Sequence, residues 1–210
     1  MALPSDPDYS WALDESSGSR LARFGSQDLT DINAVGSTTG KVGTNCAQFV
    51  AANSETLESP AAWTRPAGLA TAATWMGWVY ITGTTDQKFA SAINGSNTDR
   101  FDVYTNAGHL YAALGGKFSI KLSALSINTW YHIAAVYDGG QAASADRMKL
   151  YINGTLQTGL SQSSGQPTSI TLGTNKMYLG SLNGTSGYLG GRMDEPHLWA
   201  SARTGTEGGD

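Results

Sequence analysis

The chain has 210 residues, of which 14% are charged, and its formal net charge is −4. This balance argues against nucleic acid or an anionic membrane surface as a partner, because phosphate binding depends on clustered lysines and arginines. No window approaches the ~18 consecutive apolar residues of a membrane span, and no signal peptide is visible. The only cysteine, Cys46, excludes an internal disulfide. We expect one domain over residues 1–210, with no membrane insertion.

The first half of the chain reads as short strands separated by turns. Strands are predicted at 9–13, within 29–34, at 46–50, at 56–59 and at 74–81. Residues 60–70 carry two prolines and no period, so they are expected to form a connection. The segment 74–81 places large side chains on both faces, which is typical of a central strand.

The second half continues in the same way. Strands are predicted at 89–93, 100–105, 110–114, 117–122, 130–137, 148–152, 170–173, 177–181 and 192–199. The strand at 130–137 is mostly apolar on both faces, so we expect it to lie inside a packed structure. Asn153-Gly154 is the strongest signal for a two-residue hairpin turn, because both residues tolerate positive φ.

Strand signals recur every 8 to 12 residues, and no stretch holds a convincing helical period. The pattern therefore predicts an all-β fold, an antiparallel two-sheet β-sandwich of the jelly-roll type with about 12–14 strands. No repeat of 20 to 50 residues is present, which disfavours a propeller or solenoid.

Several blocks, in this order, resemble the laminin G-like (LamGL) modules of the concanavalin A-like lectin/glucanase superfamily, and they cover almost the whole chain. The blocks are Trp11–Gly18, Gly40–Gly43 with Phe49, Trp75–Val79, Trp130–Gly139, Leu150–Gly154, Leu179–Gly180 and Gly191–Glu195. One departure is Pro196, which replaces the usual β-branched residue after Asp-Glu. Because proline lacks an N–H, its strand is expected to be an edge or to point that position away from its partner.

The resemblance also implies a metal. In the family the first and last strands lie side by side, which would bring Asp14 near Asp194, and a structural calcium ion is often held near this strand pair. Calcium needs six to eight oxygen ligands. The alternative is that Asp14 caps its own Ser16-Ser17-Gly18 turn and that Asp194 binds backbone N–H groups.

Catalytic residues are not expected. Glycosidases of the superfamily use a carboxylate pair from a Glu-x-Asp-x-x-Glu strand, and this motif is missing. His132 is better explained as a packed, hydrogen-bonded residue, and Asp138 as part of a turn. The chain is therefore predicted not to be an enzyme.

Aromatic residues offer a sugar-stacking surface, although most are expected in the core. Trp11, Trp75, Trp78 and Trp130 fall inside predicted strands. Trp63 and Tyr188 instead lie in polar loops, so they are candidates for ligand binding. Nearby loop stretches add four further ligand candidates: Asp86, Asn97, Asp99 and Arg100.

Together these features predict a non-catalytic binding or adhesion module that recognises a glycan or another surface through loops at the sandwich rim. The alternative is a structural virion or particle protein, such as a capsid decoration or tail component, that uses the fold for protein docking. The start at Met1 without a visible signal and the end just past the closing strand favour this alternative more than usual. We expect an extracellular location or a virion or particle surface, with assembly into a particle or homo-oligomer as a further possibility.

Overall fold

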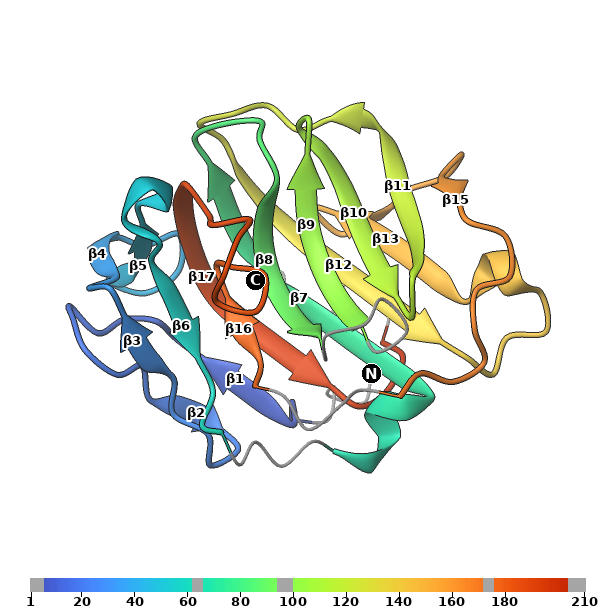
Figure 1. Ribbon diagram of the computed structural model, residues 1–210, viewed down its shortest axis with the longest axis horizontal. Helices are drawn as coiled ribbons and strands as arrows, with labels where there is room; N and C mark the ends of the chain where they lie inside the picture. The colour runs from blue at the N-terminus through green and yellow to red at the C-terminus, as the bar shows by residue number, and fades with distance from the viewer. Residues whose placement is uncertain (1–5, 62–65, 94–99, 172–175, 204–210) are drawn as a thin grey trace.

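A computed structural model describes residues 6–61, 66–93, 100–171 and 176–203. Within these ranges the chain forms two antiparallel sheets that pack face to face, and Figure 1 shows one sheet in front of the other. The prediction of an all-β sandwich is confirmed. The described residues form seventeen strands, more than the 12–14 predicted. The prediction was too low because several strands have only two or three residues, which is too short for a sequence pattern to reveal.

The nine-stranded sheet is the rear layer in Figure 1. In spatial order its main path is β14 (Thr155–Leu156), β13 (Met148–Ile152), β12 (Trp130–Asp138), β7 (Ala72–Ile81), β17 (Gly191–Trp199), β1 (Tyr9–Trp11) and β2 (Ala22–Phe24). Two further strands extend it at β17: β5 (Asn45–Phe49), which pairs with β17, and β4 (Gly36–Thr39), which pairs with β5.

The eight-stranded sheet is the front layer. Its order is β15 (Ser161–Gln162), β11 (Lys117–Ala124), β10 (His109–Leu114), β9 (Arg100–Asn106), β8 (Gln87–Ile93), β16 (Tyr178–Leu179), β6 (Thr56–Glu58) and β3 (Thr30–Ile32). Three short 3₁₀ helices connect strands: η1 (Ala51–Asn53), η2 (Ala67–Ala70) and η3 (Ser144–Asp146). None of the helices in the described ranges has the length and apolarity needed to cross a bilayer.

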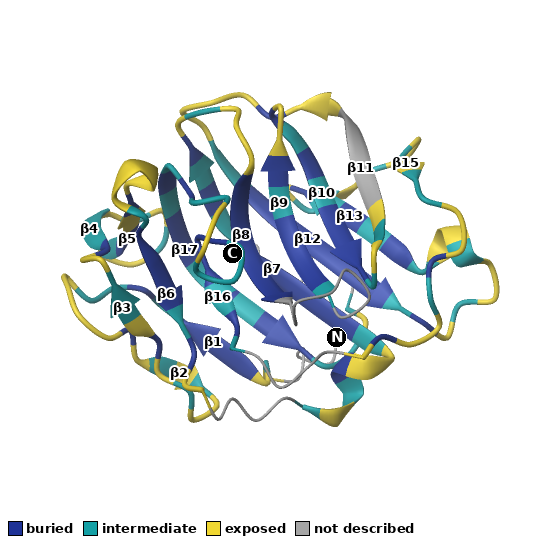
Figure 2. Ribbon diagram, viewed as in Figure 1, coloured by how far each residue is buried: buried dark blue, intermediate teal, exposed yellow. Residues whose placement is uncertain are grey.

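The core lies between the two sheets, where the strand centres are dark in Figure 2. Trp75 on β7 stacks against Phe89 on β8 with 6.3 Å between ring centroids, so this pair joins the two layers. Trp11 is also fully buried. The expectation of a central strand at 74–81 is confirmed, because β7 pairs with β12 on one side and β17 on the other.

The hairpin predicted at Asn153-Gly154 is also present. Asn153 has φ 50° and Gly154 has φ 73°, which is the pair of positive values that a type I′ turn requires. Its Asn153 side chain accepts a hydrogen bond from the His132 N–H at 2.9 Å, which fixes the turn against β12.

Pro196 does not lie on an edge strand, so that option is wrong. β17 has neighbours on both sides, with β7 on one side and β1 and β5 on the other. The strand tolerates proline because the register with β7 shifts between Asp194 and His197, which places Pro196 in a bulge. Gly77 on β7 faces this bulge, and a Cβ there would lie 3.2 Å from the Pro196 Cα.

Candidate functional site

The predicted ligand-binding residues fall into two groups. Trp63, Asn97 and Asp99 lie outside the described residues. Asp86 and Arg100 lie at opposite ends of the β8–β9 pair, and both belong to one charged cluster on the outer face of the eight-stranded sheet.

Lys88 and Asp102 form the centre of this cluster. Both side chains are buried, and the Lys88 Nζ lies 3.0 Å from an Asp86 oxygen and 3.6 Å from an Asp102 oxygen. Arg100 binds Asp102 through two parallel hydrogen bonds, with its Nε donating to Oδ1 at 2.6 Å. Burial alone would lower the pKa of Arg100, but the hydrogen bond and charge of Asp102 outweigh it and raise that pKa.

An aromatic row continues from the cluster across the sheet. The Lys88 Nζ lies 3.3 Å from the centroid of the Tyr104 ring, which stacks on Tyr111 with centroids 4.9 Å apart and planes 11° apart. Phe118 on β11 follows at 6.1 Å from Tyr111, and its side chain is 38% exposed. The row therefore crosses the strands from β8 to β11, with a diagonal last step because Phe118 lies opposite Ala113 and not opposite Tyr111.

Alternation explains why these rings point outward. The intervening residues Phe101, Val103 and Leu110 belong to the core between the sheets, so their neighbours on the pleat face away from it. We call this outer surface the Tyr104 surface. It consists of Asp86, Lys88, Arg100, Asp102, Tyr104, Tyr111 and Phe118.

The phenol group of Tyr104 is protonated and therefore neutral at ordinary pH. Burial is the largest cause that raises its pKa to about 12, and the nearby Arg100 charge lowers it by less. A neutral phenol can both donate and accept a hydrogen bond, which suits a ligand rich in hydroxyl groups.

The Tyr188 hydroxyl bonds its own loop, and its role in ligand binding stays a prediction. It donates to the Gly184 carbonyl at 2.7 Å, and the side chain is half-buried. This loop borders the Tyr104 surface, since the Lys88 N–H donates to the Gly187 carbonyl at 2.8 Å. A Cβ at Gly187 would lie 3.0 Å from the Lys88 Cγ, so the loop needs glycine there both for space and for its φ of 58°.

Asp14 and Asp194 bind the same loop. β1 pairs with β17 as the resemblance implied, and Asp194 accepts the Lys41 and Val42 N–H groups at 2.7 and 2.8 Å. Asp14 does not cap its own turn but accepts the N–H groups of residues 44 and 45 at 3.2 and 2.9 Å. N–H donors point at both carboxylates, where a cation would need further oxygen atoms.

No three histidine, cysteine, aspartate or glutamate side chains of the described residues gather closely enough to hold a metal ion. The contacts of Asp194 follow the backbone-binding alternative through one oxygen atom, Oδ2, whereas Oδ1 is buried without a hydrogen-bond partner among the described residues. Calcium binding stays a prediction that a melting experiment can decide.

His132 is packed as expected. Its side chain is 2% exposed and meets Trp78 edge-on with ring centroids 5.3 Å apart, and burial lowers its pKa. Its Nδ1 atom has no hydrogen-bond partner in the described part of the chain, so the expected hydrogen bond is not seen at that nitrogen. Asp138 acts in a turn, where it accepts the Gly140 N–H at 3.1 Å.

Trp78 and Trp130 are not core residues. Both are half-buried and lie on the outer face of the nine-stranded sheet, beside Tyr80. The sequence shows large residues on both faces of their strands, which hides the difference between the core side and the solvent side.

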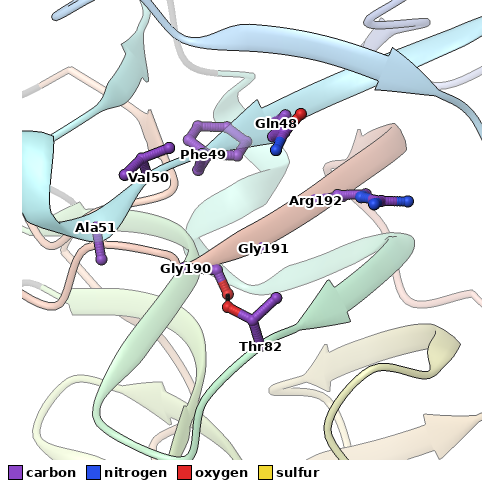
Figure 3. Close-up of a pocket in the computed structure, with 8 residues that line it drawn as sticks. All are labelled: Gln48, Phe49, Val50, Ala51, Thr82, Gly190, Gly191 and Arg192. Carbon is purple, nitrogen blue, oxygen red and sulfur yellow. Dashed lines mark hydrogen bonds between the residues drawn. The ribbon is translucent and has the colours of Figure 1, made fainter.

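A groove opens at the rim of the sandwich, between the end of β5, the end of β7 and the start of β17. Its volume is about 340 Å³, and Figure 3 shows the side chains that line it. They are Gln48, Phe49, Val50, Ala51, Thr82, Gly190, Gly191 and Arg192. None of these residues was predicted as a ligand contact, and the motif blocks that contain Phe49, Gly191 and Arg192 indicated only the fold.

The architecture defines an antiparallel jelly-roll sandwich with aromatic outer faces. Residues 35–207 match the laminin G profile of the concanavalin A-like lectin/glucanases superfamily, and the chain belongs to this superfamily. No curated protein sequence matches the chain.

Solved structures share the fold at low sequence identity. Domain 4 of an extracellular arabinanase from Geobacillus stearothermophilus, in complex with arabinotriose, is 16% identical with a TM-score of 0.65, over 98% of this chain and 97% of that one. The receptor binding domain of botulinum neurotoxin C/D mosaic serotype is 11% identical with a TM-score of 0.67, over 97% of this chain but only 50% of its own. The CBM40 of a Ruminococcus gnavus IT-sialidase, bound to α2,3-sialyllactose, is 20% identical with a TM-score of 0.51, over 65% of this chain and 79% of that one.

Proposed function

We propose that the chain is a non-catalytic module that binds a glycan at the Tyr104 surface. The observation that carries this proposal is the buried pair of Lys88 and Asp102 beneath an outward row of aromatic rings. The site lies on the sheet face, bordered by the 182–188 loop, and not on rim loops alone.

The buried charges favour a binding role over a purely structural one. Replacing a buried ion pair by packed apolar residues is often neutral or stabilising, so stability alone is a weak reason to keep it. Held rigidly by Asp102 and Asp86, Lys88 fixes the position of the Tyr104 ring. A preorganised surface of this kind loses little conformational entropy when a ligand binds.

The chemistry of the surface matches a sugar. Ring carbons of a pyranose can pack on Phe118 and the edges of the tyrosine rings, while hydroxyl groups can bind the phenols and the outer oxygen atoms of Asp86, whose side chain is 45% exposed.

Two of the proteins with this fold hold glycans, arabinotriose in the arabinanase domain and sialyllactose in the CBM40. These likenesses support a glycan as the ligand class. The arabinanase is extracellular, which is consistent with a place of action outside the cell or on a particle surface.

Catalysis is not part of the proposal. Asp102 has both oxygen atoms in contact with Arg100 or Lys88, so it is not available as an acid or nucleophile opposite Asp86. The carboxylates of Asp86 and Asp102 instead hold the Lys88 ammonium group in place.

A glycan array followed by calorimetry tests the proposal. Tyr111→Ala and Phe118→Ala should each weaken the best array ligand by about tenfold, because each removes an aromatic ring on which the sugar packs. Tyr151→Ala is the matched control, since Tyr151 is a half-buried tyrosine on the outer face of the other sheet. Equal affinity of all four proteins would place the ligand elsewhere.

A silent array would contradict the proposal. If the protein also formed stable oligomers, or bound a purified particle, the result would favour the particle-docking alternative, in which the fold serves as a virion decoration or tail component. Adhesion to a cell surface would instead require that the glycan found on the array is displayed there.

A further inference from the structure

The outer face of the nine-stranded sheet carries a row of four residues in direct register. Gln48 on β5 lies opposite Arg192 on β17, Arg192 lies opposite Tyr80 on β7, and Tyr80 lies opposite Trp130 on β12. With neighbouring strands about 4.8 Å apart, the row spans roughly 14 Å. We call it the Arg192 row.

The guanidinium group of Arg192 contacts an aromatic ring but has no carboxylate partner among the described residues. Its central carbon lies 4.8 Å from the centroid of the Tyr80 ring, and the Tyr80 and Trp130 rings are 5.5 Å apart. Among the described residues, no carboxylate lies within 4.0 Å of it and no hydrogen-bond acceptor is found for its N–H groups. Arg20, Arg23 and Arg100 differ, because each pairs with a carboxylate.

The rim groove begins at this row. Figure 3 shows Arg192 and Gln48 at one end of the groove, with Val50 and Ala51 at the other, and the Arg192 side chain extends away from Val50 and Ala51. Gln48 is exposed, and the amide has no partner among the residues that the structure describes. Val50 is 43% exposed, so the far end of the groove is apolar.

The walls of the groove are built firmly. Thr82 donates to the Gly190 carbonyl through both its hydroxyl group and its N–H, at 2.8 and 2.9 Å. The Gly190 N–H donates to the Gln87 side chain at 2.9 Å. A Cβ at Gly190 would lie 3.3 Å from the Thr82 hydroxyl and 3.7 Å from the Ala51 Cβ, so glycine keeps open the space between these two walls.

Glu55, which binds the backbone of the groove residue Val50, has its hydrogen bonds satisfied internally. Glu55 is 3% exposed, and it accepts the Val50 N–H at 2.7 Å and the Asn53 amide at 2.9 Å. The groove lining itself carries a single charged group, the cation of Arg192. In a chain of net charge −4 this leaves a local positive site.

From this geometry we propose that the groove and the Arg192 row form a second binding site, for a carboxylated sugar. The flat guanidinium fork receives the carboxylate in two parallel hydrogen bonds, and Gln48 binds a neighbouring hydroxyl. The sugar faces pack on Tyr80 and Trp130 at one end and on Val50 at the other. The choice of a sugar rests on the proposed function, whereas the requirement for a carboxylate rests on Arg192 alone.

The test uses the whole chain with two probes, a trimer of galacturonate and its fully methyl-esterified form. Calorimetry should detect the acid trimer and give at least about tenfold weaker binding for the ester, because esterification removes the charged acceptor. Arg192→Gln should weaken the acid trimer at least about tenfold, and Arg192→Lys about threefold or more, since lysine keeps the charge but lacks the fork. Lys149→Gln is the control, because it removes one positive charge from the same sheet face on β13.

Tyr111→Ala separates this site from the Tyr104 surface. The acid trimer should bind this variant as it binds the parent, whereas the best array ligand should still bind Arg192→Gln. No detectable binding of the acid trimer at about 10 mM, or equal binding of the acid and the ester, overturns the carboxylate site whatever the array shows. Loss of the acid trimer in Tyr111→Ala with no loss in Arg192→Gln overturns it as well.

Discussion

Asp194 and His197 lie three residues apart on β17, and we predict that their protonation has opposite effects on stability. Asp194 is fully buried, and burial is the largest cause that raises its pKa from 3.8 to about 6. Burial also lowers the pKa of His197 from 6.5 to about 4, with the charges of Arg23 and His132 as further causes. The two groups therefore titrate in the same pH range with opposite consequences for folding.

The sign follows from linkage. The native state binds the Asp194 proton more tightly than the unfolded chain does, so this stability is fully present below pH 3.8 and is lost as the pH rises through about 6. The native state resists protonation of His197, so that stability is present above pH 6.5 and is lost as the pH falls through about 4.

The magnitudes nearly cancel. Between pH 7.5 and pH 4.5, Asp194 adds about 2 kcal/mol to the free energy of unfolding and His197 removes about 2 to 3 kcal/mol. From these two groups, the free energy of unfolding of the parent protein should change by less than about 1 kcal/mol. Asp194→Asn should instead lose about 2 to 3 kcal/mol on acidification, and His197→Gln should gain about 2 kcal/mol.

Urea unfolding at the two pH values, with EDTA present, measures these changes within each variant. The comparison does not depend on how each substitution alters stability at neutral pH. Asp146→Asn is the control, because Asp146 is an exposed carboxylate in η3. If Asp194→Asn changed with pH by the same amount as the parent protein, the buried carboxyl would titrate normally and the reasoning would be wrong.

Three further predictions concern the ion cluster, the metal and the bulge. Lys88→Met should lower the free energy of unfolding by about 3 kcal/mol, because it leaves the buried Asp102 with Arg100 as its only cationic partner. In a double-mutant cycle measured by urea unfolding, adding Asp102→Leu should restore more than half of this loss. A thermal melt with calcium and with EDTA decides the metal, since a ligand that binds only the native state must raise the midpoint, and an unchanged midpoint removes calcium from Asp14 and Asp194. Gly77→Ala should cost about 1–3 kcal/mol because its Cβ meets the backbone of the bulge, whereas Gly36→Ala, with its nearest contact at 3.7 Å, should cost much less.

The sandwich could be predicted because its signals are local. Alternation marks β7 and β12, and glycine or asparagine with positive φ ends the hairpins, as at Ala107-Gly108 and Asn153-Gly154. Strands β2 and β4 were missed because they lie in a polar stretch, where pairing with longer neighbours and not sequence pattern holds them in place. The strand predicted at 170–173 is not seen in its described part, residues 170 and 171.

The candidate site was predictable only in outline. Asp86 and Arg100 were chosen as loop residues and do belong to the Tyr104 surface, but Asp102 looked like an ordinary strand position and Lys88 lay just before the strand predicted at 89–93. Their meeting depends on the register of β8 with β9, in which Lys88 lies opposite Tyr104. A bulge between Lys88 and Ala90 shifts that register by one position, and no feature of the sequence announces it.

Both outer faces bear aromatic rings beside cationic side chains, but the cations are paired with carboxylates on one face only. This difference decides what each face can bind. On the eight-stranded sheet, Lys88 and Arg100 are already paired with Asp86 and Asp102, so an incoming anion would have to compete with carboxylates that are held in place. On the nine-stranded sheet, Arg192 offers its charge without such competition among the described residues. Neutral hydroxyl-rich sugars therefore suit the Tyr104 surface, and acidic sugars suit the Arg192 row.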